Sequence, residues 1–77
     1  SNKKQYMMLK MIMAFSKECR SALSNGVKVE KLFALPVSEK IARAKYVPED
    51  QFEAYFKDTL AEIETSVANV VSEEVSA

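Results

Sequence analysis

The sequence predicts an all-α fold: a small helical bundle in which two long antiparallel helices are joined by short helices at a proline-bounded corner. Apolar residues recur at three- and four-residue steps near both ends of the chain, which is the spacing of one helix face. No stretch alternates cleanly between apolar and polar residues, and the single glycine leaves little material for the tight turns of a sheet. Helices therefore account for the expected architecture.

Composition limits what can stabilise this fold. The chain has 77 residues, enough for one domain whose net stability is typically only about 3–5 kcal/mol. One cysteine, Cys19, excludes an internal disulfide, and the lack of histidine excludes the common zinc ligand sets. No apolar run approaches the roughly 18 residues that a membrane span needs, so direct membrane insertion is not expected. Apolar packing, within the chain or against neighbours, must hold the structure.

The first long helix is expected from Lys4 to Ser24. Asn25-Gly26 should end it, with Gly26 in the left-handed conformation of a helix C-cap. The residues expected on its buried stripe are Met8, Ile12, Phe15, Cys19, Ala22 and Leu23. Core packing is the favoured role of Cys19, because a reactive thiol needs a neighbouring base.

Four apolar residues of the first turns fall away from that stripe: Tyr6, Met7, Leu9 and Met13. A helix that is apolar almost all round is usually buried on more than one side. These side chains are interpreted as contacts with protein outside this chain; the alternative is a flexible, Met-rich recognition surface.

Two short helical segments should follow. Residues 27–35 suit one or two turns, with Val29, Leu32 and Phe33 at helical spacing. Pro36 stops this segment and can open the next helix, which is expected from Val37 to about Ala44. Its inward-facing residues should be Val37, Ile41 and Ala44.

The last long helix is expected to start at Pro48-Glu49-Asp50, where a proline precedes two carboxylates at the positive end of the helix dipole. It should run to about Ser72, with residues 72–77 frayed. Its apolar residues follow steps of four and three, a seam suited to packing along the first helix: Phe52, Phe56, Leu60, Ile63, Val67 and Val70.

Lys40, Arg43 and Lys45 are the best polar candidates for a binding site, because they place three cations within six residues on a short, rigid element. They could bind phosphate or an acidic partner. Pairing with the acidic last helix, or simple solvation, is the favoured alternative.

Charge divides the chain into two unlike halves. Residues 1–45 carry ten Lys or Arg against three Glu, and residues 46–77 carry one Lys against eight acids. One interpretation is a small nucleic-acid-binding or protein-interaction module that uses Lys3, Lys4, Lys10, Lys17, Arg20, Lys40, Arg43 and Lys45. The favoured one is that the two halves fold against each other and largely cancel, without a nucleic-acid partner.

No motif for catalysis is present. A phosphate-binding loop needs several glycines, and nucleophilic catalysis by serine or cysteine usually needs a histidine base. Adjacent carboxylates such as Glu49 and Asp50 are explained by the electrostatics of a helix start. We therefore expect no catalytic, cofactor-binding or metal-binding residue, and no enzymatic activity of this chain by itself.

The order of "MLKMIMAFSKECRSALSNGV", "VEKLFALPVSEKIARAKYVPED" and a terminal acidic helix resembles the C-terminal end of the catalytic A (alpha) subunit of V-type and archaeal A-type ATP synthases. The bacterial and archaeal members are the more similar ones. The most specific parts are Leu35-Pro36-Val37, residues 41–46 and Pro48-Glu49. Ser38 departs from the arginine that often follows the Pro-Val pair in the family; this difference removes one interface contact that the resemblance would imply and leaves the helical interpretation unchanged.

The resemblance implies a C-terminal helical domain, residues 3–77, of a longer subunit; Ser1-Asn2 is interpreted as a remnant of cloning. ATP and magnesium would be held upstream of residue 1, in the nucleotide-binding domain. The implied partners are that domain, neighbouring B subunits and the central-stalk rotor. This segment either touches the rotor or braces the part of the subunit that does. The implied location is the cytoplasmic, membrane-peripheral head of a proton- or sodium-translocating ATPase.

Overall fold

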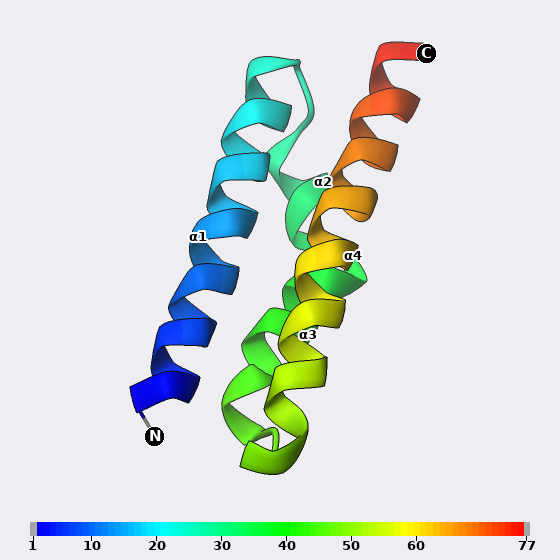
Figure 1. The fold of residues 1–77 in the computed structure, drawn as a ribbon. Coiled ribbons are helices and arrows are strands. Elements are labelled where there is room, and N and C mark those ends of the chain that lie inside the picture. Colours follow the sequence, from blue (N-terminus) through cyan, green and yellow to red (C-terminus); the bar gives the residue numbers. More distant parts are fainter. Residues whose placement is uncertain (1, 77) are drawn as a thin grey trace.

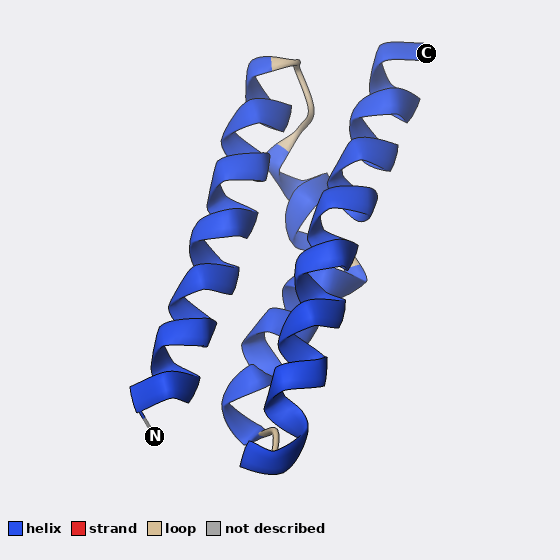
Figure 2. Ribbon diagram, viewed as in Figure 1, coloured by secondary structure: helices blue, strands red, loops and turns tan. Residues whose placement is uncertain are grey.

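A computed structural model describes the backbone of residues 2–76 and the side chains of residues 2–74. The described residues form four α-helices and one 3₁₀ turn, with no strand among them, which confirms the all-α prediction (Figures 1 and 2). The elements are α1 (Asn2–Ser24), α2 (Val29–Phe33), α3 (Pro36–Arg43), η1 (Ala44–Tyr46) and α4 (Glu49–Ser76).

The two long helices run in the same direction. Figure 1 shows α1 rising from the N-terminus and α4 rising beside it to the C-terminal end, while the segment between them descends. Side-chain contacts agree, since Lys3 lies against Glu53 and Ala22 belongs to one core cluster with Val67. The predicted antiparallel arrangement is therefore wrong.

The connection explains the parallel arrangement. Long helices joined by a tight turn must be antiparallel, but residues 25–48 form a whole return path made of α2, α3 and η1. This path carries the chain back to the level at which α1 begins, so α4 starts there and follows α1 upward (Figure 1). The short helices are therefore a layer of the bundle as well as a corner.

The turn after α1 is a Schellman motif built on Gly26. The Val27 amide donates to the Ala22 carbonyl at 3.2 Å, and the Gly26 amide donates to the Leu23 carbonyl at 3.0 Å. Gly26 has φ of 91°, in the left-handed region that the sequence predicts for it. Val27 and Ala22 are both buried, which supplies the apolar contact that accompanies this motif.

Two apolar clusters fill the interior. The upper cluster lies near the C-terminal ends of α1 and α4 and is built on Ala22, Val27, Leu32 and Val67. The lower cluster lies near their N-terminal ends and is built on Met11, Ala44 and Phe52. The seam predicted for α4 is confirmed: Phe52, Ile63 and Val67 are buried and Phe56, Leu60 and Val70 are half-buried. Val37 and Ala44 are buried and Ile41 is half-buried, also as predicted.

The predicted stripe of α1 is wrong at two positions. Ile12 and Leu23 are 49% and 43% exposed, whereas Met11 is fully buried. The inward face of α1 is thus centred on Met11, with Met7, Met8 and Phe15 packed at its sides. In α2 only Leu32 is buried, and Val29 and Phe33 are exposed.

α4 extends further than expected. It continues to Ser76, so the predicted helix end near Ser72 is wrong; the fraying of this tail stays a prediction, and Ala77 lies outside the described residues. Val70 and Val71 pack on the upper cluster, and the Glu74 carboxylate accepts a hydrogen bond from Lys31 on α2. That hydrogen bond and the negative charge of Glu74 raise the pKa of Lys31.

Candidate interaction surface

Lys40 is the most engaged of the three predicted cations. It projects from α3, and its Nζ lies 3.2 Å from Asp58 Oδ2 and 3.2 Å from Glu62 Oε2, one helical turn apart on α4. Its ammonium also lies 5.3 Å from the centre of the Tyr55 ring. The Tyr55 hydroxyl in turn donates to the Lys40 carbonyl oxygen at 2.5 Å. This confirms the favoured interpretation for Lys40, pairing with the acidic last helix.

These contacts set the ionisation of Lys40. Partial burial by itself would lower its pKa, but hydrogen bonds to Asp58 and Glu62, together with their charges, outweigh that effect and raise the pKa above its ordinary value. Lys40 is therefore held as a cation that links α3 to α4.

Arg43 and Lys45 do not join Lys40 in one site. Arg43 Nη2 lies 2.7 Å from Glu39 Oε1 one turn earlier on α3, and both side chains are exposed. Lys45 lies on η1 with its ammonium 5.1 Å from the centre of the exposed Tyr46 ring. The three cations thus form one interhelical bridge and two separate surface contacts.

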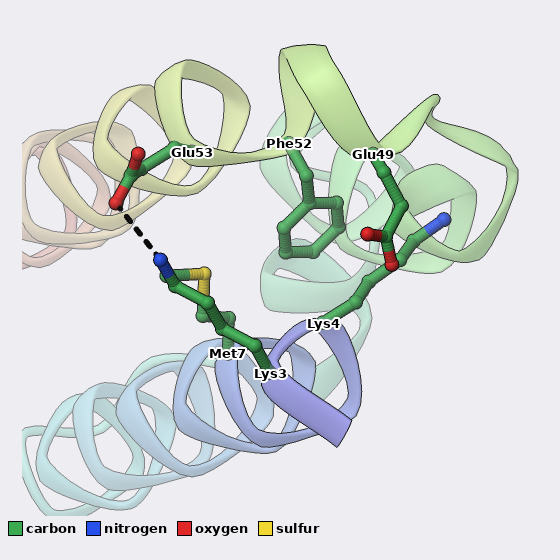
Figure 3. A pocket seen from close by; sticks show the side chains of 6 residues that line it. All are labelled: Lys3, Lys4, Met7, Glu49, Phe52 and Glu53. Carbon is green, nitrogen blue, oxygen red and sulfur yellow. Dashed lines mark hydrogen bonds and ion pairs between the residues drawn. The ribbon is translucent and has the colours of Figure 1, made fainter. Parts of the chain in front are cut away.

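The N-terminal end of α1 is tied to the start of α4. Lys4 Nζ donates to the carbonyl oxygens of Lys45 and Val47, at 3.0 Å and 2.5 Å, and lies 5.4 Å from the centre of the Phe52 ring. Figure 3 shows Lys4 and Glu49 on one side of a small pocket and the Lys3–Glu53 pair on the other. The pocket measures about 170 Å³, below the roughly 300–1,000 Å³ of ordinary small-molecule sites.

The predicted partner-contact residues of α1 divide into two groups. Tyr6, Leu9 and Met13 are 56%, 57% and 62% exposed and lie on the outward face. Met7 is half-buried and packs on the lower cluster, so its placement away from the core side is wrong. Met7 and Tyr6 are neighbours in the sequence but lie about 100° apart around the helix axis.

Sequence reasoning missed part of this outward face. Ile12, expected in the core, is exposed beside Leu9 and Met13. A 4-3 spacing through Asn2, Tyr6, Leu9, Met13, Ser16, Arg20 and Leu23 identifies the outward face, and all seven are exposed. This spacing is present in the sequence, but the apolar character of the whole first half of α1 obscures it.

Two other features bear on chemistry. Burial, followed by the charge of Glu18, raises the pKa of the Cys19 thiol, which packs on the upper cluster and stays protonated at neutral pH, as a core residue would. The hydroxyl of buried Thr59 donates to the Tyr55 carbonyl oxygen at 2.7 Å. Among residues 2–74, no three His, Cys, Asp or Glu side chains gather as a metal-binding group. None of the described helices is both long and apolar enough to cross a membrane.

The fold and surface define a class: a small, all-helical bundle that braces its two long helices with ion pairs and exposes an apolar helix face. No family model matches the chain. Its sequence is nevertheless 44% identical over 72 residues to the V-type ATP synthase alpha chain of Acetivibrio thermocellus, covering 94% of this chain and 12% of that relative.

Two further relatives agree. The V-type ATP synthase alpha chain of Clostridium perfringens strain 13 is 39% identical over 91% of this chain and 12% of its own length. The A subunit of the A-type ATP synthase of Methanosphaera stadtmanae is 43% identical over 75% of this chain and 10% of its own length. The chain is thus homologous to a segment of the alpha, or A, subunits of V-type and A-type ATP synthases, and spans about an eighth of their length.

Proposed function

We propose that residues 3–77 form the C-terminal helical domain of the A subunit of a V-type or A-type ATP synthase. The observation that carries this proposal is 44% identity to a V-type alpha chain over 94% of the chain. In this role the domain carries out no catalytic step itself. It transmits the nucleotide state of the A subunit to the central stalk through helix packing.

The packing of the bundle supports a mechanical role. Ion pairs link α4 to the other helices at three levels: Lys3 to Glu53, Lys40 to Asp58 and Glu62, and Lys31 to Glu74. Between these levels the two apolar clusters fill the space between α1 and α4. A displacement applied to one long helix is therefore carried by the other, because packed cores deform little.

The ionisable side chains also fit a role without covalent chemistry. The carboxylates of Asp58 and Glu62 form ion pairs with Lys40, and the raised pKa of Cys19 keeps its thiol protonated and therefore weakly nucleophilic. In the proposed assembly ATP and Mg²⁺ are bound by the upstream domain, which is one partner of this segment. Neighbouring B subunits and the central stalk are the others, and the assembly is the cytoplasmic, membrane-peripheral head of an ion-translocating ATPase.

The test uses the complete ATP synthase that contains this chain as the end of its A subunit. We expect Leu9→Ser/Met13→Ser to leave nucleotide binding unchanged and to lower the number of ions transported per ATP hydrolysed, because both side chains are exposed and are proposed here to contact a neighbouring part of the assembly. Lys57→Glu, an exposed change on α4, is the matched control. Unchanged coupling in the double variant, or loss of nucleotide binding, would contradict the proposal.

A further inference from the structure

The outward face of α1 has the pattern of one strand of a coiled coil. Residues 2, 6, 9, 13, 16, 20 and 23 alternate steps of four and three, which is the spacing of heptad a and d positions. The first half of this seam is apolar, with Tyr6, Leu9 and Met13 all more than half exposed. A shallow hollow lies on the middle of this seam, between Met13, Ser16 and Arg20, and is also lined by the bordering residues Ile12 and Lys17.

One border of the seam is uniformly basic. Lys3, Lys10 and Lys17 follow one another at seven-residue steps, and all are exposed. The Lys10 ammonium lies 4.7 Å from the centre of the Tyr6 ring, so charge and apolar surface adjoin directly. Arg20 adds a cation within the seam itself. The opposite border consists of Gln5, Ile12 and Cys19, none of which is acidic.

We propose that this seam docks an amphipathic α-helix, outside this chain, whose own apolar seam is bordered by carboxylates. Border charges select partner and orientation in helix pairs, and three lysines on one edge favour glutamate or aspartate across from them. The docked helix covers Tyr6, Leu9, Ile12 and Met13 and places carboxylates beside Lys10 and Lys17. The inference rests on the geometry of α1 and not on the proposed function, so either can fail without the other.

A second copy of the chain fits the same seam poorly. In an antiparallel pair the two lysine borders would face each other, and like charges there are destabilising. In a parallel pair each lysine border would face Gln5, Ile12 and Cys19, which offer no carboxylate. Charge complementarity therefore favours a different, acidic helix.

The test uses two fluorescein-labelled, three-heptad helical peptides with leucine at a and d, identical except for glutamate or lysine at e and g. Uniform border charge keeps each peptide from pairing with itself. By fluorescence anisotropy at low salt we expect the glutamate peptide to bind at least about tenfold more tightly than the lysine peptide, since several surface charge contacts add. Lys10→Glu/Lys17→Glu should reverse that preference.

Two further variants complete the experiment. Leu9→Ser/Met13→Ser should abolish binding of the glutamate peptide with an unchanged circular dichroism spectrum, because both residues are exposed. Lys57→Glu, an exposed change on α4, should leave the preference unaltered. The proposal is overturned if the glutamate peptide does not bind, if both peptides bind equally, or if sedimentation equilibrium shows that the chain dimerises through Leu9 and Met13.

Discussion

Lys3 Nζ on α1 lies 3.4 Å from Glu53 Oε1 on α4, and each residue lies in the first turns of its own helix. The pair is exposed, so its contribution to stability is small, at most about 1 kcal/mol. The pair does establish the relative direction of α1 and α4, because packed helices bring their N-terminal turns together only when they run in the same direction. The same order is kept at the other end, where Ala22 and Val67 share the upper cluster.

The parallel arrangement can be tested by paramagnetic relaxation. With Gln5→Cys spin-labelled in a Cys19→Ser background, we expect broadening of amide signals near residues 49–53 and sharp signals near residues 70–74. The two ends of α1, a helix of 23 residues, lie about 35 Å apart, so the alternatives are well separated. Broadening confined to residues 70–74 would restore the antiparallel model.

Lys40 should contribute measurably to stability. Lys40→Met keeps the apolar stem but removes the cation that bridges Asp58 and Glu62. We expect urea unfolding at neutral pH to show a loss of about 1 kcal/mol. Lys57→Met, a change at an exposed lysine of α4, is the matched control and should be nearly neutral.

The same variant carries a pH prediction. The pKa of Lys40 is raised on folding, so its stabilisation is fully present below its ordinary value of 10.5 and is lost as pH rises through the folded value. The difference in unfolding free energy between wild type and Lys40→Met should therefore be constant from neutral pH to near that value and shrink above it. A difference that persists in strong alkali would show that charge is not the cause.

Gly26 should be sensitive to backbone conformation alone. A Cβ added there meets nothing within 4 Å, so any loss of stability comes from its φ of 91°. Gly26→Ala is expected to lower the free energy of unfolding by about 1–2 kcal/mol, and Gly26→Asn by less, because asparagine tolerates the left-handed region. Equal losses for alanine and asparagine in urea unfolding would argue against a conformational cause.

Leu32 and Phe33 are neighbours with opposite expectations. Leu32 is fully buried and Phe33 is 66% exposed. Leu32→Ala should cost about 2–5 kcal/mol, comparable with the whole stability of a domain of this size, and should leave the chain largely unfolded at 37 °C. Phe33→Ala should change the thermal midpoint little. Equal midpoints for the two variants in circular dichroism melts would refute the assigned register of α2.

The sequence determines the helices better than it determines their arrangement. Pro36 and Gly26 mark two helix boundaries by backbone chemistry alone, and both fall where expected. The predicted direction of α4 is wrong, because it depends on how far residues 25–48 travel, which local propensity does not encode. The predicted α1 stripe is misplaced at Ile12 and Leu23 because methionines surround that helix and several stripes fit equally well.

The sequence also predicts some features of the candidate interaction surface and not others. The pairing of Lys40 with the acidic last helix follows from charge, but the identity of Asp58 and Glu62 requires the tertiary fold. Buried Thr59 escapes sequence reasoning because its polar type hides its position on the inward face of α4. The exposure of Tyr6, Leu9 and Met13 is predictable, since they fall off any single stripe that also includes Phe15.

The proposed function assigns this chain a mechanical role and places nucleotide binding elsewhere in the A subunit. Isothermal titration of the 77-residue chain with Mg-ATP tests it most directly. We expect no binding heat beyond dilution at any ATP concentration up to the millimolar range. Saturable binding with micromolar affinity would contradict it.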